Sequence, residues 1–137
     1  MARLSSNSAR GGRTIAVLVA DDHPIVRQGL ISLLSATPDI EVVAIAANGA
    51  QAVDRADAYR PDVVLMDLSM PSLNGAEATE AIVARDAGAR VVVLTAFGDR
   101  EHLDRALAAG ACSYVLKDAT PRALLAAVRA AAAGAAV

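Results

Sequence analysis

Short, continuous apolar runs recur along this chain, and they constrain its fold more than any other feature. The clearest run is Val63–Met66, which ends in the carboxylate of Asp67 and is followed by a Pro-Ser-Leu-Asn-Gly turn. Continuous apolar runs of this kind, bounded by turn residues, are typical of strands buried on both faces. The sequence predicts five strands, at residues 14–20, 40–46, 63–67, 90–95 and 111–116.

Segments with helical periodicity separate these runs. In the first of them the apolar residues fall on one helical face, which is formed by Val26, Leu30, Leu33 and Leu34. We expect helices from residue 24 to about 37, and at 50–59, 74–86, 99–109 and from 120 onward. Regular alternation of strands and helices with short connections predicts an α/β domain, in which a parallel sheet with right-handed crossovers carries helices on both faces.

Length and composition exclude several classes of protein. The 137 residues are enough for one domain, and 55% hydrophobic residues with only 2% aromatics require a core of Val, Leu, Ile and Ala. A net charge of −2 argues against nucleic-acid binding by this chain alone. The single Cys112 cannot form an internal disulfide, and the chain has neither a membrane-length apolar run nor a signal peptide, so we expect a cytoplasmic protein. Residues 1–12 are expected to be a flexible leader before a domain at 13–137.

Polar side chains collect where the predicted strands end. Asp21 and Asp22 follow the first strand, Asp67 ends the third, Thr95 ends the fourth, and Lys117 follows the fifth. The carboxyl ends of parallel strands lie at one edge of the sheet, where ligands bind in open α/β folds. The sequence therefore predicts a site that combines three carboxylates, a hydroxyl and an ammonium group.

Three converging carboxylates repel one another, so they either take up a proton or bind a metal ion. Mg²⁺ is the natural cation, because it prefers oxygen ligands, and the backbone carbonyl of Ser69 is a candidate ligand beside the acids. With Mg²⁺ bound, Asp67 becomes a plausible nucleophile toward phosphorus. Lys117 and the Thr95 hydroxyl are placed to neutralise or hydrogen-bond the transferred oxygens.

Each of these residues also has a simpler interpretation. Asp22 and Asp67 can each be a helix N-cap, Lys117 a solvated strand end, and Thr95 a β-branched strand residue. Their joint occurrence at four strand ends favours a site over four independent structural roles. His23 can be a metal ligand, but a solvent-facing residue at a helix start is the favoured interpretation.

Other side chains are expected to be structural. His102 is expected at the surface, and Cys112 as a small buried hydrophobe. Tyr114 lies three positions before Lys117, hence on the opposite face of the strand, turned toward the helix at 99–109 and half-buried. That helix has a thin apolar face, made mainly of Leu103 and Leu107.

The set Asp21-Asp22, Asp67, Thr95 and Lys117, with Met70-Pro71 after the central acid, resembles the receiver domain of bacterial two-component response regulators. The resemblance covers about residues 13–133. Three stretches are similar to the NarL/FixJ (LuxR-type) subfamily, namely Val-Ala-Asp-Asp-His-Pro at 19–24, Leu-Thr-Ala-Phe at 94–97 and Tyr-Val-Leu-Lys-Asp-Ala at 114–119. The resemblance implies a flavodoxin-like, doubly wound sheet of five strands in the order 2-1-3-4-5, and this order is carried over from the chemotaxis member of the family.

The resemblance also implies a function. Asp67 would accept a phosphoryl group from a sensor histidine kinase, or from a small donor such as acetyl phosphate, and the domain would catalyse its own phosphorylation and dephosphorylation rather than act as a conventional enzyme. Mg²⁺ would be held by Asp22, Asp67 and the Ser69 carbonyl, with Asp21 acting through water. Thr95 and Tyr114 would form the switch pair. Residues bordering the site, Ser69, Ala96 and Phe97, would tune access and dephosphorylation.

Members of this subfamily usually continue into a helix-turn-helix DNA-binding domain, which this chain does not contain. We expect a homodimer on phosphorylation and DNA contact only through that further domain. A stand-alone receiver that acts through protein–protein contacts is the alternative. Two other classes are less favoured: an aspartyl-phosphate hydrolase would have a second Asp where Ser69 stands, and in a flavodoxin-like FMN binder Asp21-Asp22 would repel the flavin phosphate.

Overall fold

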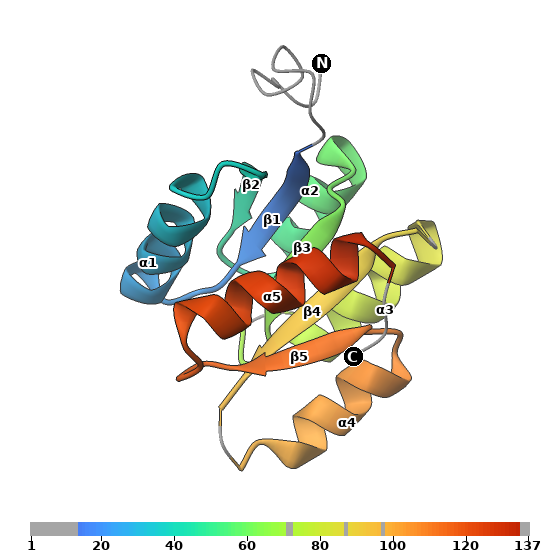
Figure 1. Ribbon diagram of the computed structural model, residues 1–137. Coiled ribbons are helices and arrows are strands. Elements are labelled where there is room, and N and C mark those ends of the chain that lie inside the picture. The colour runs from blue at the N-terminus through green and yellow to red at the C-terminus, as the bar shows by residue number, and fades with distance from the viewer. Residues whose placement is uncertain (1–13, 71–72, 87, 97, 135–137) are drawn as a thin grey trace.

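Five strands and five helices alternate in the computed structural model, which describes residues 14–70, 73–86, 88–96 and 98–134 (Figure 1). The strands are β1 (Ile15–Ala20), β2 (Ile40–Ala46), β3 (Val63–Asp67), β4 (Arg90–Thr95) and β5 (Ser113–Leu116). The helices are α1 (Pro24–Ser35), α2 (Gly49–Tyr59), α3 (Gly75–Arg85), α4 (Arg100–Ala108) and α5 (Pro121–Ala132). The leader predicted at 1–12 lies outside the described residues.

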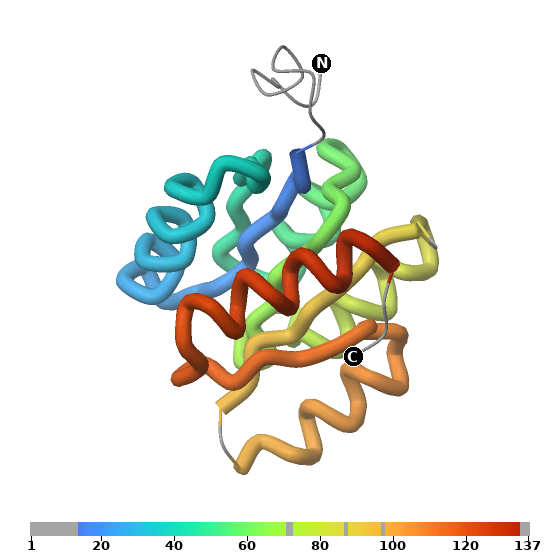
Figure 2. Tube along the Cα trace, viewed as in Figure 1, coloured from blue at the N-terminus to red at the C-terminus, as the bar shows by residue number. Residues whose placement is uncertain are grey.

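All neighbouring strands pair in parallel, in the order β2-β1-β3-β4-β5. Figure 2 shows the chain passing from β1 to the edge strand β2, back across β1 to the central β3, and then outward to β5. The direction of winding thus reverses between β1 and β3. The predicted flavodoxin-like order is confirmed, and in such sheets ligands bind in the crevice beyond the strand ends at this reversal.

Side chains of the central strands alternate between two hydrophobic cores. Leu18, Val64 and Met66 face the core under α2, α3 and α4. Val19 and Leu65 face the second core, under α1 and α5. Every residue of β3 is buried, as the continuous apolar run predicted. Within the part of the chain that the structure describes, no helix is long and apolar enough to cross a membrane.

Local residue chemistry explains where the helices begin. Asn74 caps α3, because its side chain accepts from the N–H of Glu77 while the Glu77 carboxylate accepts from the N–H of Asn74. Asn48 and Thr120 cap α2 and α5 in the same position. Pro24 starts α1, where its missing N–H costs nothing.

Some details differ from the sequence-based expectation. β5 is only four residues long and is not buried on both faces, because it is an edge strand whose Tyr114 and Leu116 line a hollow beside α4. In α4 the fully buried residue is Ala106, whereas Leu107 is exposed and Leu103 is only partly buried. Val26 is exposed as well, because it lines a hollow between α1 and α5 instead of packing on the sheet.

Candidate functional site

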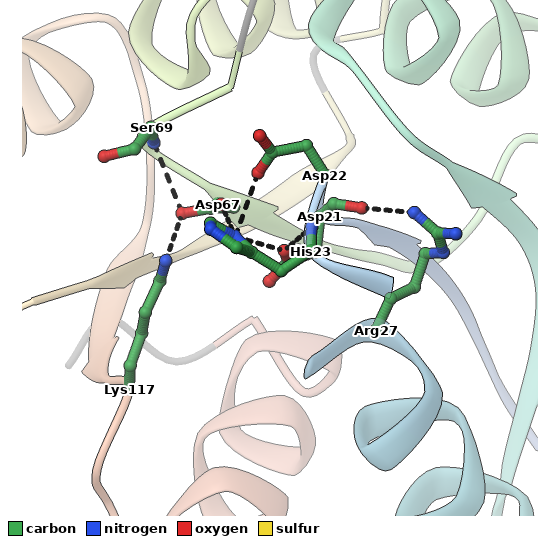
Figure 3. A network of polar contacts seen from close by, with 7 residues as sticks. All are labelled: Asp21, Asp22, His23, Arg27, Asp67, Ser69 and Lys117. Carbon is green, nitrogen blue, oxygen red and sulfur yellow. Dashed lines mark hydrogen bonds and ion pairs between the residues drawn. The ribbon is translucent and has the colours of Figure 1, made fainter. Parts of the chain in front are cut away.

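The ends of β1 and β3 bring three carboxylates together. The N–H of Asp21 donates to the carbonyl of Ala46 (3.0 Å), which extends the β1–β2 pairing to the last residue before the loop. Asp67 is the last residue of β3, the strand that pairs with β1 on its other side. Two neighbouring central strands therefore present Asp21, Asp22 and Asp67 at the same edge (Figure 3).

Asp67 lies at the centre of the site and is fully buried. Its Oδ1 lies 2.8 Å from Lys117 Nζ and accepts a hydrogen bond from the N–H of Ser69 at 3.2 Å. Its Oδ2 has no hydrogen-bond partner among the residues that the structure describes. One oxygen of Asp67 is thus held in place by a cation and an amide, while the other remains free to bind or react.

Asp21 is also fully buried, whereas Asp22 is partly exposed, with 27% of its side-chain surface accessible. Asp21 Oδ1 accepts from the N–H of His23 at 2.8 Å, and its Oδ2 has no hydrogen-bond partner in the described ranges. Burial raises the pKa of Asp21 most, the hydrogen bond from the His23 N–H lowers it, the charge of Asp67 raises it and Lys117 lowers it, and the net pKa is raised. The folded state therefore disfavours the charged form of this carboxyl.

Lys117 is positioned by backbone pairing, because its N–H donates to the carbonyl of Thr95 at 2.9 Å. Burial by itself lowers the pKa of Lys117, but the hydrogen bond and charge of Asp67, with the charges of Asp21 and Asp22, outweigh it, so the net pKa is raised. Lys117 is therefore a fixed positive charge at neutral pH.

The cluster is suited to a divalent cation. One ligand atom from each of Asp21, Asp22, His23 and Asp67 can be chosen so that all four lie within 4.8 Å of one another. The free oxygens of two fully buried carboxylates, on Asp21 and Asp67, belong to this cluster. Buried oxygens without partners are costly unless a proton or a cation satisfies them. Carboxylate oxygens are ligands for a hard cation such as Mg²⁺.

The predicted switch residues lie beside this cluster but outside its hydrogen bonds. Thr95 is buried, and its hydroxyl donates only a long bond, 3.4 Å, to the carbonyl of Ala96. Tyr114 is about half exposed, with 49% of its surface accessible, and it lines a hollow together with Thr95 and Leu103. Its side chain therefore lies on the α4 side of β5, as its spacing from Lys117 predicted. Phe97 lies outside the described residues.

Sequence reasoning missed two contributors to the site. Arg27 donates through Nη1 to the carbonyl of Asp21 at 2.8 Å, which fixes the loop after β1 (Figure 3). Gly75 lies so close to β3 that a Cβ there would be 2.6 Å from the carbonyl oxygen of Asp67. The sequence carries no local signal for the first contact, which depends on how α1 packs against the sheet. For the second, Asn74-Gly75 indicated the end of a turn and the start of a helix, but not the close approach to Asp67.

Comparisons with known proteins agree with this geometry. The family model for the response regulator receiver domain matches residues 17–129. The nitrate/nitrite response regulator NarL of Escherichia coli K12 is 42% identical over 118 residues, 86% of this chain and 55% of NarL. The transcriptional regulatory protein LiaR of Bacillus subtilis is 42% identical over 120 residues, 88% of this chain and 57% of LiaR.

Among solved structures, the receiver domain of the response regulator NarL from Mycobacterium tuberculosis aligns with a TM-score of 0.85 and 34% identity, covering 90% of this chain and 99% of that domain. This chain spans about half the length of the curated relatives it matches. Fold, site geometry and sequence identity therefore lead to one assignment: the chain belongs to the response regulator receiver domain family, in its NarL/LuxR subfamily.

Proposed function

We propose that this domain receives a phosphoryl group on Asp67 and relays that modification to a switchable surface. The observation that carries the proposal is the asymmetry of Asp67: a buried carboxylate with Oδ1 held by Lys117 and Oδ2 left without a partner. A nucleophile needs a free oxygen, and a fixed cation beside it neutralises the charge of an incoming phosphate.

In the proposed reaction, Asp67 Oδ2 attacks the phosphorus of the donor. The new bond joins this oxygen to phosphorus, while the bond from phosphorus to the donor breaks. The electron pair of that bond goes to the imidazole nitrogen of a sensor histidine kinase, or to the acetate oxygen of acetyl phosphate. Lys117 remains against the carboxylate and stabilises charge on the transferred oxygens. Hydrolysis of the same acyl phosphate returns the domain to its starting state.

Mg²⁺ is the cation we propose for the cluster. Its ligands would be Asp22, Asp67 and the Ser69 carbonyl, with Asp21 linked through water. When bound, it supplies charge neutralisation to the phosphoryl oxygens. Support comes from the buried Oδ2 of Asp21 and Oδ1 of Asp22, which have no hydrogen-bond partner among the described residues and need a positive charge. The backbone of Ser69 already contacts the cluster, because its N–H donates to Asp67 Oδ1.

Thr95 and Tyr114 form the proposed switch pair. Among the described residues, one long bond holds the Thr95 hydroxyl, so it can turn toward a phosphate on Asp67 at small cost. Tyr114 can then move inward, since the two residues line the same hollow of about 300 Å³ beside α4. Moving a two-state equilibrium from 1:99 to 99:1 needs about 5.5 kcal/mol. Two charge-assisted hydrogen bonds, at about 1.5 to 3 kcal/mol each, supply an energy of that order.

The surrounding partners follow from the subfamily. We propose that a sensor histidine kinase phosphorylates the domain in the cytoplasm, that phosphorylation promotes a homodimer, and that a DNA-binding domain like those of transcription-regulating relatives carries the output. The alternative is a receiver that acts alone through protein contacts.

Incubation with acetyl phosphate and Mg²⁺ tests the central step. We expect intact-mass analysis to show one added phosphoryl group on the wild type and none on Asp67→Asn. The matched control is Asp104→Asn, which removes an exposed carboxylate on α4 and should label normally. Labelling that persists in Asp67→Asn would refute the assignment of Asp67.

A further inference from the structure

His23 lies across the mouth of the acidic cluster. It is the N-cap residue of α1, but its side chain makes no capping hydrogen bond. Instead, its Nδ1 lies 3.1 Å from Asp22 Oδ1, 3.3 Å from Asp21 Oδ1 and 3.9 Å from Asp67 Oδ2 (Figure 3). The imidazole is therefore placed as a fourth member of the cluster, although 58% of its side-chain surface is exposed.

These separations are close to those of ligands around one metal ion. Bonds of about 2.1 Å from a metal to nitrogen or oxygen place adjacent ligands roughly 3.0 Å apart in an octahedron and roughly 3.4 Å apart in a tetrahedron. The distances from His23 Nδ1 to Asp22 and Asp21, 3.1 and 3.3 Å, are already in that range. The whole set spans at most 4.8 Å, so small side-chain rotations suffice to close it.

Buried oxygens without a partner indicate that the cluster takes a cation. Asp21 and Asp67 are fully buried, and each has an Oδ2 that has no hydrogen-bond partner within the described part of the chain. A proton on either acid would satisfy one oxygen, but a metal ion satisfies both at once. The nitrogen of His23 then decides which metal is favoured, because imidazole suits Zn²⁺, Ni²⁺ and similar ions, whereas carboxylates and water suit Mg²⁺.

We propose that His23 Nδ1 is a metal ligand that gives this pocket a second cation preference, for a first-row transition ion such as Zn²⁺ or Co²⁺ in competition with Mg²⁺. The inference rests on the proposed function, since it uses the same three carboxylates. A transition ion held by His23 keeps the imidazole against Asp67 Oδ2, the oxygen that the proposed reaction needs free. Occupancy by such an ion therefore opposes phosphorylation, whereas Mg²⁺ supports it.

Co²⁺ is the probe, because its visible absorption reports ligand type and geometry without any phosphorylation assay. Wild type, His23→Ala and Asp22→Asn are titrated with Co²⁺ by absorbance and with Mg²⁺ by calorimetry. Loss of groups that only orient metal ligands weakens binding about 10- to 100-fold. We therefore expect His23→Ala to weaken Co²⁺ at least about tenfold while Mg²⁺ affinity changes less than about twofold. His23→Ala should fold normally, since the side chain caps nothing.

The matched control is His102→Ala, because His102 is the other histidine and its Nδ1 pairs with Asp99 Oδ1 at the surface. This variant should keep the wild-type Co²⁺ affinity of the acidic pocket.

Equal Co²⁺ affinity in wild type and His23→Ala would overturn the inference while leaving the proposed Mg²⁺ site intact. A parallel loss of Mg²⁺ and Co²⁺ in His23→Ala would overturn it too, because nitrogen ligation should affect the transition ion selectively. The proposed function fails separately, if the wild type does not bind Mg²⁺ or if Asp22→Asn leaves Mg²⁺ affinity unchanged.

Discussion

Replacing Asp21 by Asn should stabilise the domain in the absence of divalent cations. Burial raises the pKa of Asp21, and the charge of Asp67 raises it further, so the ionised carboxyl is less favourable in the folded than in the unfolded state. Asparagine keeps the shape and the Oδ1 that accepts from His23 at 2.8 Å, but it removes the charge. The substitution therefore relieves an electrostatic cost without leaving a cavity.

The magnitude follows from the geometry of the cluster. Ligand atoms of Asp21 and Asp67 lie within 4.8 Å of each other. At that separation two like charges repel by about 3 kcal/mol at an effective dielectric constant of about 20. Part of this gain is offset, because Asp21→Asn also weakens the hydrogen bond from the His23 N–H and loses the attraction of Lys117. We expect a net increase of about 1 to 2 kcal/mol in the free energy of unfolding, or about 4 to 8 °C in Tm.

Thermal and urea unfolding at several pH values, with EDTA and then with Mg²⁺, provide the assay. A raised folded-state pKa means that the penalty is complete above that pKa, shrinks as pH falls through it, and vanishes below the ordinary value of 3.8. The advantage of Asp21→Asn should therefore be present at neutral pH and be lost in acid. Mg²⁺ should reduce the difference in stability between Asp21→Asn and the wild type, because it stabilises the wild type more than the variant. An Asp21→Asn variant no more stable than wild type at neutral pH in EDTA would refute this reasoning.

Three further substitutions test other parts of the structure. Lys117→Met should lower the free energy of unfolding in urea by about 2 to 3 kcal/mol, less than the usual loss for a broken buried pair because 27% of the Lys117 side chain is exposed. Adding Asp67→Asn should recover most of this loss. If the effects of the two substitutions simply add, Lys117 and Asp67 are not coupled. Gly75→Ala should lower the free energy of unfolding by about 1 to 3 kcal/mol, because the added Cβ would overlap the Asp67 carbonyl. A neutral or stabilising effect would contradict the close approach of Gly75 to β3. Asp39→Asn should lower the free energy of unfolding only slightly, because the bonds from Arg129 to Asp39, at 2.9 Å, lie at the surface. These bonds lower the pKa of Asp39, so the loss should be present above pH 3.8 and disappear as pH falls through the folded pKa. A loss that does not depend on pH would contradict this prediction.

The sheet could be predicted in detail because its signals are local. The fully apolar residues of β3 required burial on both faces, and β1 and β4 carried the same signal. Helix starts were equally readable from Pro24, Asn74 and Thr120. Strand order was less accessible, because periodicity does not say which strands are neighbours, and it came from the family resemblance.

The positions of Asp21, Asp67 and Lys117 followed from the rule that parallel strands end at one edge. The side-chain contacts did not. Whether the imidazole of His23 turns toward solvent or toward the acids depends on the rotamer at the first turn of α1, which the sequence does not encode locally. The contact of Arg27 with the Asp21 carbonyl also depends on how α1 is seated, and so requires the folded structure.

The two sides of the site differ in how firmly they are held. Asp21 follows β1 and Asp67 ends β3, two central strands whose residues are almost all buried, so the backbone positions of both acids are fixed by strand pairing. On the other side, β5 alternates between buried and exposed residues and α4 buries only Ala106 completely. A change of charge at Asp67 therefore cannot be absorbed by moving β1 or β3. Rearrangement is least costly toward Tyr114 and α4, which is the direction in which a phosphorylation signal should spread.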